Sequence, residues 1–190
     1  MQHIRDRTFT LTVLMGFALA GCDYIGILRP SVVEQLEPPV VHLLNTLPDV
    51  DRPNEAVVAR LFATGGSTDA ELGADGVMRS EVWARPGQMI WTPAVIVMPQ
   101  GGELELTFHN PDEGHHMAYM PSNGGREVLD LPPHTSGNVR LSLNAPGLYW
   151  FGCPVANHAG RNMLGFILVE GTVPAQALLD RPAQPQPQED

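Results

Sequence analysis

Lysine is absent from this chain of 190 residues, cysteine occurs only twice, and no hydrophobic run is long. The eleven positive side chains are all arginines, and they face 21 aspartates and glutamates, which gives a formal charge of −10. Binding to nucleic acid through counterion release needs a basic surface, so that class of function is excluded. An acidic surface keeps a protein soluble and also suits a basic partner protein. Hydrophobic residues make up 43% of the chain, which is enough for one globular core.

The N-terminus carries a run with the length of a signal peptide. Arg5 and Arg7 precede the apolar stretch Phe9–Ala20, which is too short to cross a bilayer. The stretch is followed by Gly21 and Cys22, and residues 19–22 (Leu-Ala-Gly-Cys) resemble the lipobox of bacterial lipoproteins. The resemblance implies cleavage before Cys22 and acylation of that cysteine, and several acyl chains together form a stable anchor. A plain secretory signal with an incidental cysteine is the alternative.

These features predict where the protein resides and how the chain is divided. We expect a lipid anchor at Cys22 on the periplasmic face of the cell membrane. Asp23 favours the inner membrane, because an aspartate at this place retains enterobacterial lipoproteins there. Once Cys22 is acylated, Cys153 is the remaining thiol, so no structural disulfide is expected. The predicted parts are a signal peptide (1–21), a tether or extension (22–76), one folded domain (77–172) and a disordered tail rich in Pro and Gln (173–190).

Prolines divide the extension into short pieces. Helices are predicted within residues 31–47 and 53–62, the second with Pro53 in its first turn. The extension is either a spacer or a layer packed on the domain. Its apolar side chains, such as Leu61 and Phe62, favour at least partial packing.

The folded domain consists of short β-type runs separated by Gly, Pro and Asn. Leu104, Leu106 and Phe108 alternate with polar residues, as do Val139 and Leu141. Period-two alternation without a helical period predicts an all-β protein with an antiparallel sandwich. The expected strands are residues 81–84, 90–98, 103–109, 116–120, 138–143, 148–153 and 164–169.

Residues 147–170 contain the pattern that predicts chemistry. Phe151 and Cys153 lie on the same side of a predicted strand, which Pro154 ends. His158 and Met163 follow on a short loop before the next strand, so the spacing is Cys-x4-His-x4-Met. Taken singly, such residues are usually core or surface residues. Together, a thiolate, an imidazole and a thioether are soft ligands that suit copper rather than magnesium or calcium.

A trigonal blue-copper site needs a second histidine from elsewhere in the chain, with methionine as a long axial ligand. The segment 108–124 offers three candidates, His109, His115 and His116. Here the stretch from Glu81 to Gly171 resembles a cupredoxin.

Two features of that resemblance select the same histidine. Phe108, Asn110 and His116 fit the spacing of plastocyanin- and amicyanin-type proteins. His116 is also followed by a run similar to the cupredoxin domain of cytochrome oxidase subunit II, formed by Pro121, Ser122 and Gly124. His115 is the alternative ligand, and His109 is the remaining candidate.

The resemblance implies a Greek-key cupredoxin β-sandwich that holds one type 1 copper ion per chain. The binuclear centre of oxidase subunit II needs two cysteines in the loop, whereas this loop has Cys153 alone, so the site should be mononuclear. Its spacing resembles that of rusticyanin and sulfocyanin. The implied metal ligands are His116, Cys153, His158 and Met163, and Asn110 resembles the asparagine that ties the ligand loops together.

Such a site implies single-electron transfer and not an enzyme, because four protein ligands leave no position for a substrate. The expected partner is a cytochrome c, a periplasmic dehydrogenase or an oxidase. It would dock on an apolar patch beside His158 that includes Pro154, Val155 and Ala156. The alternative is a periplasmic copper-binding protein for storage, delivery or metalloenzyme assembly. In either case we expect a monomer.

Overall fold

The structure is a computed structural model that describes residues 38–120 and 127–180. The predictions for Cys22, Asp23 and the segment 181–190 lie outside the described residues, as does the run from Pro121 to Gly124. Among the described residues, no helix combines the length and the apolar character needed to cross a membrane.

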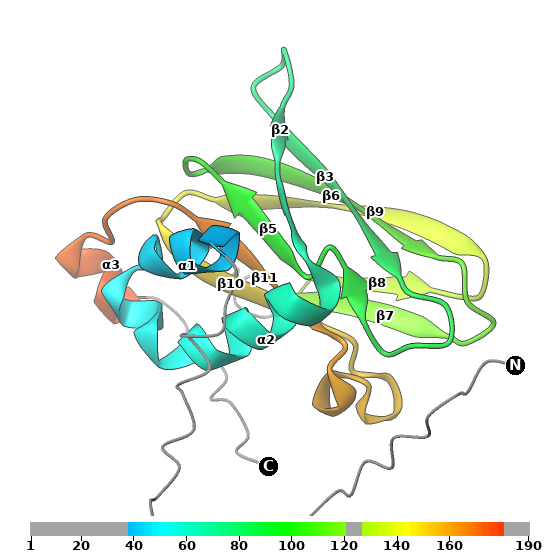
Figure 1. Ribbon diagram of the computed structural model, residues 1–190. Helices are drawn as coiled ribbons and strands as arrows, with labels where there is room; N and C mark the ends of the chain where they lie inside the picture. Colours follow the sequence, from blue (N-terminus) through cyan, green and yellow to red (C-terminus); the bar gives the residue numbers. More distant parts are fainter. Residues whose placement is uncertain (1–37, 121–126, 181–190) are drawn as a thin grey trace, which may run out of the picture.

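Two β-sheets pack face to face (Figure 1). The first sheet contains, in spatial order, β1 (Ser67–Asp69), β5 (Val95–Met98), β11 (Leu164–Val169), β10 (Gly147–Gly152), β7 (His116–Met120) and β8 (Glu127–Leu131). The second contains β2 (Glu71–Leu72), β3 (Met78–Ala84), β6 (Gly102–Asn110) and β9 (Thr135–Leu143), with β4 (Trp91–Thr92) paired to β3. The predicted all-β sandwich is confirmed.

The strand directions differ from the prediction in one respect. β5 runs parallel to both β1 and β11, and β3 runs parallel to β6, so both sheets are mixed rather than antiparallel throughout. Alternation along a strand shows which face is buried, but it contains no information about the direction of the neighbouring strand. The direction depends instead on how the connections cross between the sheets.

A dense apolar core lies between the sheets. Trp91, Phe108 and Phe151 are fully buried in it, and the ring of Phe108 lies edge-on to both other rings, at centroid distances of 5.4 Å and 5.5 Å. Gly165 permits this packing, because a Cβ there would lie 2.2 Å from the Phe151 ring. Every methylene in such a core contributes to stability, so the strands that enter the predicted site are firmly held.

A helical layer covers the outer face of the first sheet (Figure 1). It consists of α1 (Pro38–Asn45), a 3₁₀ segment (Asp49–Asn54) and α2 (Glu55–Gly65). The buried Asp51 carboxylate accepts a hydrogen bond from the Leu148 N–H at 2.8 Å, which ties this layer to β10. The layer and the sheet bury a second core formed by Val40, Leu43, Leu44, Leu47, Val57, Val58, Ala59, Leu61, Ala94, Val95, Leu148, Phe166 and Leu168. Residues 38–65 therefore form a packed layer rather than a spacer.

Besides the helical layer, three further elements lie outside the range 77–172 that the sequence assigned to the domain. β1 and β2 belong to the sheets although they lie in the predicted extension, and α3 (Ala175–Asp180) lies in the predicted tail. β1 and β2 have three and two residues, too few to carry a hydrophobic alternation, and their backbones pair with β5 and β3.

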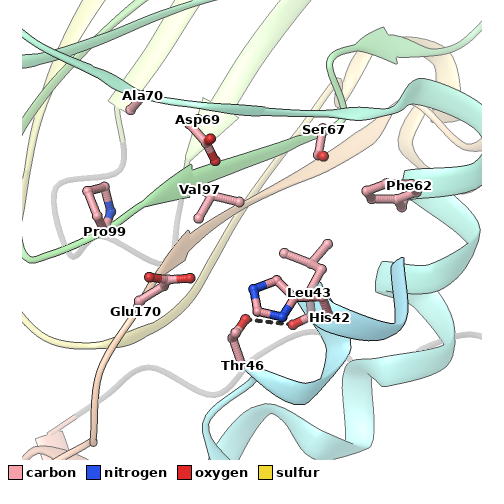
Figure 2. A pocket seen from close by; sticks show the side chains of 10 residues that line it. All are labelled: His42, Leu43, Thr46, Phe62, Ser67, Asp69, Ala70, Val97, Pro99 and Glu170. Atoms are coloured by element: carbon pink, nitrogen blue, oxygen red, sulfur yellow. Dashed lines mark hydrogen bonds between the residues drawn. The ribbon is translucent and has the colours of Figure 1, made fainter. Parts of the chain in front are cut away.

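A pocket opens between the helical layer and the edge of the first sheet (Figure 2). It contains none of the predicted metal ligands, so it is separate from the site described next. Its lining residues are His42, Leu43, Thr46, Phe62, Ser67, Asp69, Ala70, Val97, Pro99 and Glu170.

Candidate metal centre

Three predicted ligands from two distant parts of the chain meet in a buried cluster. His116 begins β7, Cys153 follows β10, and His158 lies in the connection from β10 to β11. Their ligand atoms all lie within 4.8 Å of one another. Cys153 Sγ is 3.4 Å from His158 Nδ1 and 4.0 Å from His116 Nδ1, and the two Nδ1 atoms are 3.3 Å apart.

The alternation along β7 determines which histidine faces inward. His116, Ala118 and Met120 are buried, whereas the intervening residues are partly exposed. His115 precedes the strand with a side chain 48% exposed, and its Nε2 lies 2.5 Å from Asp130 Oδ1. A shift of one residue along a strand turns a side chain to the opposite face. The structure thus brings His116, and not His115, into the cluster.

His109 also lies outside the cluster. Its ring stacks on Trp83 at a centroid distance of 3.9 Å, and its Nδ1 is 2.8 Å from Ser136 Oγ. His109 alternates with the buried residues Phe108 and Asn110 along β6, so it faces away from the core. This histidine is therefore not positioned as a ligand.

The loop from Cys153 to Met163 is closed by backbone hydrogen bonds. The Cys153 N–H donates to the Met163 carbonyl at 3.0 Å, and the Met163 N–H donates to the His158 carbonyl at 2.9 Å. A third bond joins the Ala159 N–H to the Cys153 carbonyl at 2.9 Å. Met163 is fully buried beside Cys153 in the same core. The loop thereby fixes the relative positions of its three predicted ligands.

Three residues of this loop have left-handed backbones, Ala156 (φ 43°), Asn157 (φ 59°) and Asn162 (φ 85°). Asparagine tolerates this region, whereas alanine is disfavoured there by roughly 1–2 kcal/mol. A conformation of this kind persists where the surrounding contacts over-determine it, and such residues concentrate at functional sites.

Asn110 joins the segment before His116 to the end of β8. Its Nδ2 donates toward the carbonyls of Gly114, Leu131 and Pro132 at 2.8–3.0 Å, and its Oδ1 accepts from the Asp112 N–H at 3.0 Å. The side chain is buried. These bonds hold the loop that presents His116, and none of them joins it to the loop with Cys153, His158 and Met163.

Burial sets the protonation states of the cluster. It lowers the pKa of His116, although the nearby Asp112 opposes this effect, and it also lowers the pKa of His158, with the neighbouring His116 as a further cause. Burial raises the pKa of the Cys153 thiol, although N–H groups including that of Met117, 3.4 Å from Sγ, favour the thiolate. The pKa shifts therefore favour neutral imidazoles and a protonated thiol. A metal ion that binds here displaces one proton, from Cys153.

Two residues near the cluster were not found from the sequence. The buried Trp91 ring lies 6.2 Å from the His116 ring, between centroids, and Asp112 Oδ2 lies 3.6 Å from His116 Nε2. Asp112 precedes His116 by four residues, but that spacing has no meaning in a loop. Only the fold shows that this carboxylate faces the ligand.

The donors fit a soft metal ion. One thiol and two neutral imidazoles converge in a buried space, and the thioether residue Met163 packs in the same core. Hard cations such as magnesium and calcium prefer oxygen ligands, whereas this set suits copper.

The two packed sheets, with a His-Cys-His cluster at the start of β7 and just after the end of β10, have the architecture of a cupredoxin. A family model described as PQQ-associated (MSMEG_3727_PQQ-assoc) matches residues 38–187, and the chain belongs to this family. The match includes the helical layer as well as the sandwich. No curated protein matches the chain.

Several solved structures are distantly similar to the chain. Sodium-dithionite-reduced auracyanin from Roseiflexus castenholzii is 18% identical at a TM-score of 0.44, and the match covers 49% of this chain and 97% of auracyanin. The metal-binding domain of the Cu(I)-exporting P-type ATPase CopA from Streptococcus pneumoniae is 19% identical at a TM-score of 0.44. That match covers 55% of this chain and 96% of the CopA domain. Auracyanin A, a blue copper protein from Chloroflexus aurantiacus, is 13% identical at a TM-score of 0.43, and the match covers 50% of this chain and 100% of auracyanin A. These likenesses are distant, and the resemblance to a cupredoxin comes from the two sheets and the ligand cluster of this chain itself.

Proposed function

We propose that the protein binds one copper ion and carries single electrons between redox partners. The observation that carries the proposal is the buried cluster of His116, Cys153 and His158. When bound there, copper would cycle between Cu(II) and Cu(I), which is the chemistry that a thiolate and two imidazoles support. Met163, which packs in the same core, would supply a weak thioether ligand.

The residues around the cluster suit electron transfer better than catalysis. His116 and Cys153 are almost completely enclosed, so a substrate has no access through them. His158 is 8% exposed and is therefore the ligand nearest to solvent. Beside it Pro154 and Ala156 are exposed and Val155 is partly exposed, which provides a small apolar surface for a partner. We therefore propose that the protein is a carrier and not an enzyme.

The family description favours one class of partner. A PQQ-associated carrier would accept electrons from a quinone-containing dehydrogenase. A periplasmic dehydrogenase is one of the three partners expected from the sequence, beside a cytochrome c and an oxidase. The proposed place for this exchange is the periplasmic face of the cell membrane, with the chain anchored by lipid at Cys22. We also propose that the protein is a monomer.

Copper storage or delivery is the second candidate function, because the same donors would bind copper tightly. Enclosure of the cluster argues against it, since a delivery site must expose its metal to the acceptor. The closed hydrogen-bonded loop argues in the same direction, because release would require it to open.

The two functions differ in what happens to the copper during repeated reduction and oxidation. We expect the copper-loaded protein to keep its metal in the presence of a Cu(I) chelator and to exchange one electron per chain reversibly. In rapid mixing with a reduced PQQ-dependent dehydrogenase, Ala156→Arg should slow electron transfer by about tenfold, since a charge in an apolar contact must lose its hydration. Ala74→Arg, a change at another exposed alanine in the connection between β2 and β3, is the matched control.

Loss of copper to the chelator in the first reduced cycle would support storage or delivery instead. Equal rates for the Ala156 and Ala74 variants would show that the surface beside His158 is not the docking site.

A further inference from the structure

We propose that Asp112 is the positioning residue of the metal centre: its carboxylate keeps the His116 proton on Nε2 and stabilises the oxidised state of the metal. The second half of this inference rests on the proposed copper binding, whereas the first half concerns the metal-free protein as well.

The two nitrogens of His116 face different surroundings. Nδ1 points into the cluster, 3.3 Å from His158 Nδ1. Nε2 lies on the other side of the ring and is buried, and no atom of the described residues forms a hydrogen bond with it. The charged group facing Nε2 is Asp112, whose Oδ2 is 3.6 Å away. A neutral imidazole has one N–H, so its neighbours decide which nitrogen carries it.

Asp112 is held in place by backbone groups from two loops. Its Oδ1 accepts from the Glu113 N–H at 2.8 Å, and its Oδ2 accepts from the Gly87 N–H at 3.2 Å. Its own N–H donates to Asn110 Oδ1 at 3.0 Å. The side chain is only 20% exposed. Asp112 is therefore a fixed carboxylate, and it joins the connection between β3 and β4 to the connection between β6 and β7 that presents His116.

This geometry has a consequence for each nitrogen. A proton on Nε2 is attracted to the carboxylate, and the lone pair of Nδ1 is then free to bind a metal. The negative charge behind the imidazole also favours Cu(II) over Cu(I), because the oxidised ion carries the larger positive charge. Carboxylates behind ligating histidines typically change metal affinity by about 10–100-fold.

The test compares Asp112→Asn with Glu113→Gln in the full-length protein. We expect Asp112→Asn to lower the preference for Cu(II) over Cu(I) by about tenfold, which raises the reduction potential by about 59 mV for a one-electron couple. Glu113 is the neighbouring carboxylate. Its side chain is 88% exposed to solvent, and its Oε1 lies 3.2 Å from His134 Nε2. Its neutralisation should leave the potential nearly unchanged, because solvent screens an exposed charge. Equal potentials for the two variants would overturn the stabilisation of Cu(II).

The metal-free protein gives an independent measurement. The ¹⁵N chemical shifts of the His116 ring should show the proton on Nε2 in the wild type, and this preference should weaken in Asp112→Asn. A wild-type proton on Nδ1 would overturn the positioning role. If the wild type failed to bind copper, the proposed function would fail, while this tautomer measurement would still decide the role of Asp112.

Discussion

His116→Ala should bleach the copper-loaded, oxidised protein, whereas His115→Ala should leave its colour intact. His116 is one of three strong donors and its Nδ1 faces the cluster, so its removal should weaken copper binding by more than about 100-fold. His115 contacts Asp130 at the surface, and an exposed ion pair contributes about 1 kcal/mol or less to stability. Visible absorption and the copper-to-protein ratio check both variants. A bleached His115→Ala protein beside a coloured His116→Ala protein would show that the register of β7 is shifted by one residue.

Asn110→Ala should destabilise the metal-free protein by about 3 kcal/mol. Its buried amide donates hydrogen bonds to the carbonyls of Gly114, Leu131 and Pro132. Each buried polar group that loses its partner costs about 1–3 kcal/mol of stability. Urea unfolding monitored by tryptophan fluorescence measures the loss. Asn138→Ala is the control, because Asn138 is exposed on β9 and most surface changes stay within about 0.5 kcal/mol.

If the two asparagine variants were equally stable, Asn110 would not be the residue that joins the segment before His116 to the end of β8. A destabilised Asn110→Ala protein should also bind copper more weakly, because the loop presents His116 at the start of β7.

The sequence was most informative where burial alternates along a strand. The alternation of Leu104, Leu106 and Phe108 predicted β6, whose side chains the structure buries on one face. β8 was missed because of its five residues only Leu131 is fully buried, so the alternation is too weak to detect. The parallel pairs were missed because no local pattern shows the direction of a neighbouring strand.

The cluster could be predicted because Cys153 and His158 follow one another, with Met163, on a single loop, and the resemblance to cupredoxins selected His116. Asp112 and Trp91 could not be predicted in the same way. Trp91 reaches His116 from β4 through the packing of the core, and the Gly87 N–H that holds Asp112 lies 25 residues away along the chain. Contacts of this kind depend on the tertiary structure and leave no spacing in the sequence.

The packing of the helical layer was only partly predictable. The apolar side chains of residues 53–62 indicated contact with the domain, but the partners of that contact are Val95, Phe166 and Leu168 on the outer face of the first sheet. If the outer face of the first sheet were solvated, the outward-facing residues of β11 would be polar. The sequence of β11 is apolar throughout, which indicates that a second layer covers that face.

The visible absorption spectrum of the copper-loaded, oxidised protein, taken together with its copper content, tests the central claim most directly. We expect one copper ion per chain and an intense thiolate-to-copper band that disappears on reduction, returns on oxidation and is absent from Cys153→Ser. A colourless oxidised protein with bound copper, or a band that survives in Cys153→Ser, would contradict the assignment of His116, Cys153 and His158 as the copper ligands of an electron carrier.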